Sequence, residues 1–337
     1  MKKSLLITLV LVLAISSMAM AAREYPARPI TDVVVWGAGG GTDTCNRIVA
    51  GEMGKFLGVN VNVTNKPGGV AGSIGLNYGY NQAHDGYTIT GLSESNVTSA
   101  VMGGFDKRFN VWYPFIVGGS PDIVSVTPDS PYQSLEELIA AAKENPEEIK
   151  AAACDAGSIH NLNLLALEDG AGIEFNFIPY PGSSPSQTAA MTGEVTVVIT
   201  SLAEQQQLIR GGKLRPLATL TENSMELDGV GTIPSGLKIE PGLKEYLPIS
   251  QAIGMAVPND VPDEVKAKLT DAFNKALATD KVQDWAKKNY YILSGKTGEE
   301  AQEVFAKLES NFSWTLWDLG TAEVNPAELG IPKPGEL

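Results

Sequence analysis

Short apolar runs alternate with stretches of helical periodicity along most of the chain. The runs are bounded by glycine, proline and polar residues, as strands are, and the intervening stretches carry apolar residues three and four positions apart. This alternation predicts an α/β fold built on mainly parallel sheets flanked by helices. The predicted strands are Thr31–Trp36, Val59–Thr64, Thr88–Leu92, Ile123–Thr127, Ile149–Ala153, Glu174–Ile178, Val195–Thr200 and Leu214–Thr219.

Several helix starts are marked by a serine or threonine with a glutamate or glutamine three residues later. This pattern is typical of a capping box, in which the two side chains bond each other's backbone N–H groups. It occurs at Ser134, Ser184, Ser201 and Thr297. Helices that begin directly after strands matter for function, because ligands of open α/β sheets bind at the carboxyl ends of the strands.

The stretch "VVVWGAGGGTDTCNRIVAGEMGKFLG", residues 33–58, places a glycine-rich turn between a strand and a helix. It lacks the last glycine of the dinucleotide fingerprint, where Thr42 stands, and it lacks the lysine of a P-loop. Glycines leave backbone N–H groups approachable, and a helix N-terminus attracts negative charge. The turn therefore suits a carboxylate or another small anion. The alternative is a plain strand–helix turn capped by Thr42 or Asp43.

Three later turns have the same character. They are Asp155-Ala156-Gly157-Ser158, Pro181-Gly182-Ser183 and Thr200-Ser201, and each separates a predicted strand from a predicted helix. Two lobes that present such edges to each other would surround an anion with neutral amides and hydroxyls. An acidic protein can bind an acid in this way, because local dipoles set the potential of the cleft.

The first residues, "MKKSLLITLVLVLAISSMAMAA", have two lysines, an apolar run too short for a stable membrane span and a small-residue cleavage pattern. This predicts a secretory signal peptide over residues 1–22 and a periplasmic location. The remainder of about 315 residues is long enough for two lobes with separate cores.

Charge and composition narrow the function further. The net charge is −14, which disfavours nucleic acid and anionic membranes as partners. Two cysteines and two histidines give no zinc-type cluster, so we expect no metal and no cofactor. Cys45 and Cys154 fall on opposite predicted lobes, so we expect free buried thiols rather than a disulfide.

The order of these motifs resembles the periplasmic solute-binding proteins of tripartite tricarboxylate transporters, also called the Bordetella uptake gene family. The resemblance covers nearly the whole chain after the signal peptide, and it rests on the joint order and spacing of motifs that are individually weak. These motifs are Tyr25-Pro26-x-Arg28-Pro29-Ile30, Ala38-Gly39-Gly40-Gly41-Thr42-Asp43, "VNVTNKPGGVAGSIG" from Val59, "HDGYTITG" from His84, Gly157-Ser158-x-His160, "PYPGSSP" from Pro179, "GEV" from Gly193 and "GGKLRPLA" from Gly211.

The resemblance implies a two-lobed, type II-like Venus flytrap that binds its ligand without altering it. Lobe one would comprise residues 23–126 and 250–337, and lobe two residues 127–249. The implied ligand is a small carboxylate, such as a di- or tricarboxylate, an amino acid or an aromatic acid. The implied partners are the large and small subunits of a membrane permease driven by an ion gradient, and the protein itself would be a monomer.

The resemblance also implies a binding site in which main-chain amides and hydroxyls hold the ligand. Carried over by position, the site residues are Trp36, Gly39, Gly40, Thr42, Asp43, Ser73, Ser93 and Ser95 in lobe one, and Asp155, Ala156, Gly157, Ser158, His160, Gly182, Ser183 and Thr200 in lobe two.

The chain departs from the family at points that bear on the ligand. Val35-Trp36 replaces the usual proline and aromatic residue, Cys154-Asp155 replaces small neutral residues, and Thr196 stands where the family has an aspartate. An aspartate facing the cleft would repel a second carboxylate, or it would bind an amine or a hydroxyl of the ligand. Glu94 would select an amine or face solvent.

Two alternatives remain from the residues alone. A sensory protein that presents its ligand to a membrane kinase would have the same fold and cleft. A hydrolase would use Ser158 or Cys154 with His160, but no third orienting group is evident in the sequence.

Overall fold

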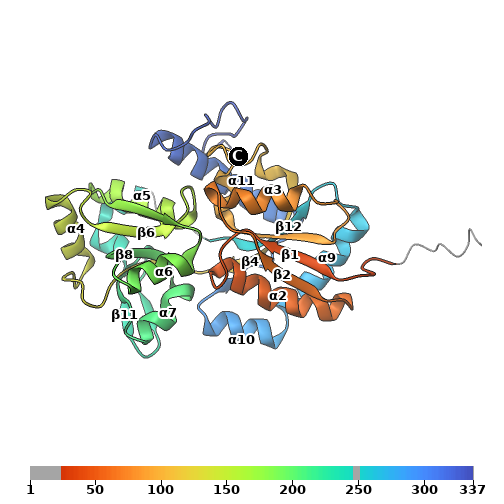
Figure 1. Cartoon of the computed structure of the whole chain (residues 1–337), viewed down its shortest axis with the longest axis horizontal. Coiled ribbons are helices and arrows are strands. Elements are labelled where there is room, and N and C mark those ends of the chain that lie inside the picture. The colour runs from red at the N-terminus through yellow and green to blue at the C-terminus, as the bar shows by residue number, and fades with distance from the viewer. Residues whose placement is uncertain (1–23, 246–250, 337) are drawn as a thin grey trace, which may run out of the picture.

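The chain forms two α/β lobes that lie side by side (Figure 1). The structure is a computed structural model, and it describes residues 24–245 and 251–336. The predicted signal peptide lies outside the described residues. So does Ser250, the first residue of the second segment predicted for lobe one.

The first lobe is built on a six-stranded sheet. In order across the sheet, its strands are β13 (Ile292–Leu293), β4 (Trp112–Gly119), β12 (Ile253–Pro258), β3 (Thr88–Leu92), β1 (Ile30–Val34) and β2 (Val61–Asn65). Its helices are α2 (Gly41–Leu57), α3 (Ser73–Tyr80), α9 (Asp263–Leu277), α10 (Asp280–Lys288) and α11 (Gly298–Asp318), with 3-10 turns η1 (Val70–Gly72), η2 (Glu94–Thr98) and η3 (Phe109–Val111).

The second lobe is built on a five-stranded sheet in the order β7 (Asn176–Tyr180), β6 (Lys150–Cys154), β8 (Val197–Ser201), β5 (Asp122–Val126) and β9 (Arg215–Thr219). A separate two-stranded hairpin, formed by β10 (Met225–Leu227) and β11 (Gly231–Ile233), belongs to the same lobe. Its helices are α4 (Leu135–Glu144), α5 (Ile159–Ala171), α6 (Ser183–Met191), α7 (Leu202–Arg210) and α8 (Gly236–Ile239), with the 3-10 turn η4 (Pro241–Glu245).

Both sheets are mixed. The strands β2, β1 and β3 are parallel, as are β7, β6 and β8, in line with the predicted strand–helix–strand alternation. However, β12 is antiparallel to β3 and β4, and β5 is antiparallel to β8 and β9. The eight predicted strands all exist, with ends that differ by one or two residues, whereas β4 and β12 were not among them.

Each sheet is covered on both faces. On the first sheet, α2 and α9 pack on one face and α3 and α11 on the other. On the second sheet, α4 and α5 cover one face and α6 and α7 the other. In β8, Val197 and Ile199 enter one core and Val198 the other, because successive side chains of a strand point to opposite faces.

Three of the four predicted helix starts are confirmed, because Ser134, Ser201 and Thr297 are the N-cap residues of α4, α7 and α11. Ser134 caps α4, and Ser201 forms a full capping box with Glu204 at the start of α7. The predicted start at Ser184 is wrong by two residues, because the N-cap of α6 is Gly182, whose φ of 127° favours glycine, and the helix begins at Ser183. Thr297 precedes α11 but makes no side-chain cap bond.

The chain passes from the first sheet to the second at Ser120 and Pro121, between β4 and β5. The strand β5 therefore belongs to the second sheet, whereas the sequence had placed residues up to 126 with the first. An apolar run such as Ile123–Thr127 indicates a strand, but it does not indicate which of two sheets the strand joins.

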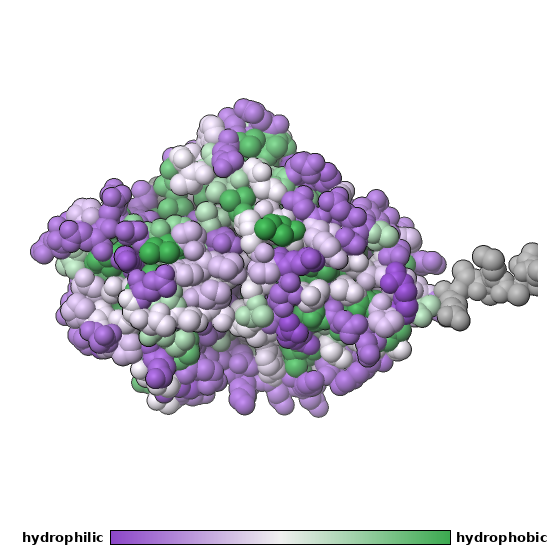
Figure 2. Space-filling view, in the orientation of Figure 1, coloured by the Kyte–Doolittle hydropathy of each residue, from purple (hydrophilic) through white to green (hydrophobic). Residues whose placement is uncertain are grey.

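Polar residues predominate on the face shown in Figure 2, and apolar residues there form small, separate groups. Among the described residues, no helix is long and apolar enough to cross a membrane.

Candidate ligand-binding site

Helix starts from both lobes meet at a small cavity between the lobes. Its volume is about 20 Å³, which is room for about one water molecule. Lobe one contributes the N-terminus of α2, the Trp36 side chain and η2, and lobe two contributes the starts of α5, α6 and α7. Eight of the residues predicted from the sequence line it: Trp36, Gly40, Thr42, Ser93, Ser95, His160, Gly182 and Ser183.

The glycine turn before α2 bonds both within its own lobe and, through the Gly37 N–H and the Pro181 carbonyl, to lobe two. Gly39 has a φ of 84°, a conformation that favours glycine, and its N–H donates to Asp43 Oδ2 over 2.9 Å. Asp43 also accepts hydrogen bonds from Arg47 and Asn65. Its carboxylate is thus fully used within lobe one, and Gly39 and Asp43 are not part of the cavity lining.

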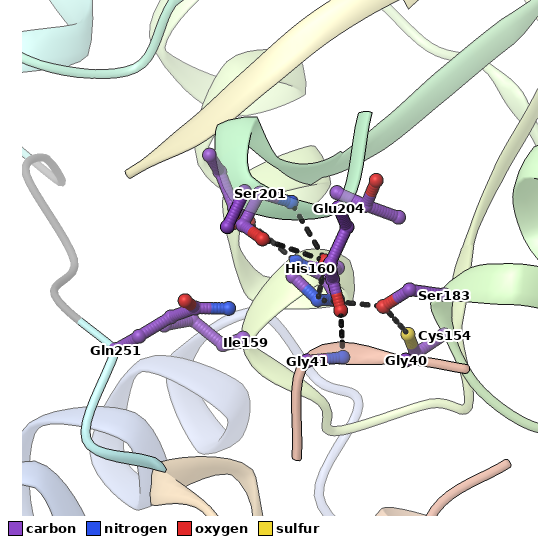
Figure 3. A network of polar contacts seen from close by, with 12 residues as sticks. Gly40, Gly41, Cys154, Ile159, His160, Ser183, Ser201, Glu204 and Gln251 are labelled. Carbon is purple, nitrogen blue, oxygen red and sulfur yellow. Dashed lines mark hydrogen bonds and ion pairs between the residues drawn. The ribbon is translucent and has the colours of Figure 1, made fainter. Parts of the chain in front are cut away.

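The Glu204 side chain reaches across the cleft to the N-terminus of α2. Its Oε1 accepts a hydrogen bond from the Gly41 N–H over 2.5 Å, and its Oε2 accepts from the N–H and hydroxyl of Ser201 (Figure 3). The glycine turn therefore binds a carboxylate in this structure, and that carboxylate belongs to the other lobe. Glu204 therefore takes part both in the capping box predicted at Ser201 and in the contact between the lobes.

His160 lies between three polar groups in the cavity wall. Its Nδ1 is 2.7 Å from Asp122 Oδ2, and its Nε2 is 3.2 Å from Ser183 Oγ and 3.5 Å from Glu204 Oε2. Burial disfavours the charged ring, but the Asp122 carboxylate outweighs this and raises the pKa of His160 well above its usual value. The raised pKa favours the imidazolium form, in which both ring nitrogens donate.

Ser183, His160 and Asp122 have the connectivity of a serine hydrolase triad. Asp122 is the third orienting group that sequence reasoning did not find. A general base must be a neutral imidazole, however, and the raised pKa of His160 disfavours that form. Cys154 Sγ lies 3.4 Å from Ser183 Oγ, and burial raises the pKa of this thiol, so it does not act as a thiolate.

Glu94 and Trp36 form the lobe-one wall of the cavity. The Glu94 carboxylate is 1% exposed; its Oε2 accepts from the Ala252 N–H over 2.5 Å and its Oε1 from Ser95 Oγ over 3.1 Å. Burial raises its pKa. The Trp36 indole N–H donates to Ser93 Oγ over 3.1 Å. Glu94 thus faces the cavity and not solvent, and Trp36 both fills the core and lines the site.

Two predicted site residues of lobe two bind lobe one instead. The carbonyl of Ala156 accepts from the Ala71 N–H over 3.2 Å, and that of Gly157 accepts from the Thr98 hydroxyl over 2.6 Å. These carbonyls face donors of the opposite lobe and do not line the cavity. Because backbone groups buried between lobes need partners, this turn stabilises closure.

Four further predicted residues lie outside the cavity lining. Ser158 caps α5 by accepting from the Asn161 N–H, and Thr200 accepts from Gln187 Nε2. Ser73 is buried in lobe one at the start of α3. Asp155 is half-buried, and burial raises its pKa to about 6.

The remaining lining residues were not predicted. The sequence predicted Glu204 only as part of a helix cap. Glu94 and Cys154 were considered as functional residues but were not included in the predicted site. Gly41 could have been inferred from its place beside Gly40 in the first turn. The others are Ile159, Gln251 and Ile253. In residues 24–245 and 251–336, no group of histidine, cysteine and acidic side chains is arranged to hold a metal ion, and both cysteines are buried free thiols.

Two sheets joined at a cleft lined by helix N-termini define a two-lobed solute-binding protein, and known proteins show the same fold. The structure of the periplasmic binding protein BugD superimposes with a TM-score of 0.78 over 88% of this chain and 99% of BugD, at 24% identity. MatC from Rhodopseudomonas palustris, solved with bound malate, gives a TM-score of 0.75 over 86% of this chain and all of MatC, at 20% identity.

Sequence comparison places the chain within one family of such proteins. Residues 45–297 match the tripartite tricarboxylate transporter family receptor, TctC. The UPF0065 protein in the tcbD-tcbE intergenic region of Pseudomonas sp. strain P51 is 30% identical over 304 residues, which cover 87% of this chain and 85% of the relative. The chain therefore belongs to the tripartite tricarboxylate transporter receptor family. It is a solute-binding protein of the periplasmic type and not an enzyme, as the sequence had predicted.

Proposed function

We propose that this receptor captures a small carboxylate-bearing solute between its lobes and delivers it to a membrane permease of the tripartite tricarboxylate type. Export through a cleaved signal peptide to the periplasm, with the large and small permease subunits as partners, is part of the same proposal. The malate bound to its structural neighbour MatC is consistent with such a ligand.

The observation that carries the proposal is the carboxylate of Glu204 on the Gly41 N–H. The first turn of α2 is thereby seen to accept a carboxylate group, with the helix dipole directed at it. A solute carboxylate that takes this place would gain a charge-assisted hydrogen bond of about 1.5–3 kcal/mol. It would also lie near the imidazolium of His160.

The cavity of about 20 Å³ is too small for any such solute while Glu204 occupies it. Entry therefore requires that the lobes part at Ser120–Pro121 and that Glu204 withdraws from Gly41. Closure over the solute would then restore the contacts of Ala156 and Gly157 with lobe one. Such hinge closure is common in two-lobed binding proteins.

Calorimetric titration of the protein expressed without residues 1–22 tests the proposal. The ligand panel pairs mono-, di- and tricarboxylates, amino acids and aromatic acids with the matching uncharged amides. We expect at least one acid to bind with micromolar affinity or better, about −8 kcal/mol, and its amide to bind far more weakly. Equal binding of the acids and their amides, or no heat with any acid, would refute carboxylate capture.

A further inference from the structure

The charged side chains that line the cavity are mostly negative. Among the described residues of the lining, Glu94 and Glu204 are acidic, and His160 is the one cationic side chain. No lysine or arginine of the described chain lines the cavity, so a ligand with several carboxylates would meet no cation other than His160.

The positive charge of His160 is already compensated. Its Nδ1 is bonded to Asp122 Oδ2 over 2.7 Å, and Asp122 is 3% exposed. The other oxygen of Asp122, Oδ1, has no hydrogen-bond partner among the described residues. Because His160 Nε2 also lies 3.5 Å from Glu204 Oε2, the three acidic side chains Asp122, Glu204 and Glu94 share one cation, and among the described residues Glu94 has no cationic partner of its own.

These glutamates are held at the cavity from opposite lobes. Glu94 is fixed by the Ala252 N–H and Ser95, and Glu204 is anchored by the N–H and hydroxyl of Ser201. The Ser201 anchor does not depend on Gly41. When a solute carboxylate displaces Glu204 from Gly41, the Glu204 carboxylate therefore stays beside the cavity, where it can accept from a cationic donor.

Trp36 adds a second feature that suits a cation. Its indole lines the same cavity, 6% exposed, with its N–H committed to Ser93. The ring faces of tryptophan attract ammonium groups, and carboxylates nearby reinforce that attraction.

We infer that the ligand of this receptor is a zwitterion, a small amino acid or related solute whose carboxylate binds at Gly41 while its ammonium group lies between Glu94, Glu204 and the Trp36 ring. This inference rests on the proposed function, because it assigns the carboxylate to the same turn. A zwitterion adds no net charge to the cavity, whereas a dicarboxylate adds two negative charges beside two glutamates.

Matched pairs of solutes that differ only in the amino group test the inference. We would titrate the protein with L-aspartate against succinate, L-glutamate against glutarate, and L-alanine against propionate, at constant pH and ionic strength. For the pair that binds best, we expect the amino member to bind tighter by about tenfold or more, since its ammonium pairs with buried carboxylates.

Glu94→Gln removes one charge and keeps the acceptor for the Ala252 N–H, and Glu204→Gln is the second variant in case the first fails to fold. In either variant the preference for the amino member should fall by about tenfold. Glu136→Gln, an exposed glutamate on α4, is the matched control for a general charge effect and should leave the preference unchanged.

The outcomes separate the two proposals. If succinate, glutarate or propionate binds as tightly as its amino partner, the inference fails and carboxylate capture stands. If amines without a carboxylate bind as well as the amino acids, the carboxylate proposal fails. A preference for amino acids that persists in both glutamine variants would also refute the role assigned to Glu94 and Glu204.

Discussion

Replacing Gly41 by alanine should weaken carboxylate binding while leaving the fold in place. A Cβ at this position would lie 2.8 Å from Glu204 Oε1, 2.9 Å from the Tyr291 hydroxyl and 3.1 Å from Ile253 Cδ1. These atoms are ends of side chains, which can move, so the backbone of α2 need not shift. The new methyl group would lie closer to Glu204 Oε1 than a Cβ normally approaches an oxygen, and it would push the acceptor of the Gly41 N–H away.

The magnitude follows from the lost hydrogen bond. An amide-to-carboxylate bond is worth about 1.5–3 kcal/mol, so Gly41→Ala should raise Kd by roughly 10- to 150-fold. Gly51→Ala is the matched control, because it makes the same change on the same helix at a position with no neighbouring atom within 4 Å. It should leave Kd unchanged and stabilise the protein by about 0.5–1 kcal/mol.

The assay is calorimetric titration with the acid of the panel that binds wild-type protein best, alongside thermal unfolding of both variants. If Gly41→Ala binds that acid within twofold of the wild type while remaining folded, the turn at the start of α2 is not the carboxylate site. If Gly51→Ala weakens binding to the same degree, the effect lies in the helix as a whole and the reasoning from the Cβ position is wrong.

Two further predictions concern protonation. Asp122 holds the pKa of His160 well above about 6.5, so the imidazole NMR signals should remain those of the charged ring at pH 7. In Asp122→Asn, the midpoint of the His160 titration should move to lower pH. A wild-type midpoint near 6.5 would contradict this reasoning. The pair stabilises the fold fully below the unfolded-state pKa, and this contribution is lost as pH rises through the higher folded-state value. Burial raises the pKa of Cys45 and Cys154, so neither should react with a thiol reagent in native protein at pH 8, and both should react after unfolding.

The binding site shows where sequence reasoning is strong and where it ends. The glycine turn at Gly39–Thr42 and the turns at Gly182-Ser183 and His160 could be predicted, because each is a local strand–turn–helix pattern with its own composition. Glu204 could be predicted only as a cap for Ser201, since that contact spans three residues. Its second contact, with Gly41, joins positions 163 residues apart, and no local pattern records it.

The same limit applies to the charges of the cleft. His160 was visible in the sequence as a residue in the first turn of a helix, but its protonation depends on Asp122, which is supplied by a different strand of the second sheet. Asp43 was expected near the ligand and is instead used by Gly39, Arg47 and Asn65 within lobe one.

The sequence by itself determined the α/β alternation, eight strands, the anion-suited turn before α2 and the family, because hydrophobic period and turn chemistry are local properties. The tertiary structure alone decided that β5 joins the second sheet, that Asp122 charges His160, and that the carboxylate on Gly41 comes from Glu204. These depend on which distant segments pack together, within lobe two for β5 and for Asp122 with His160 and between the lobes for Glu204 with Gly41. The order of neighbouring residues does not record such packing.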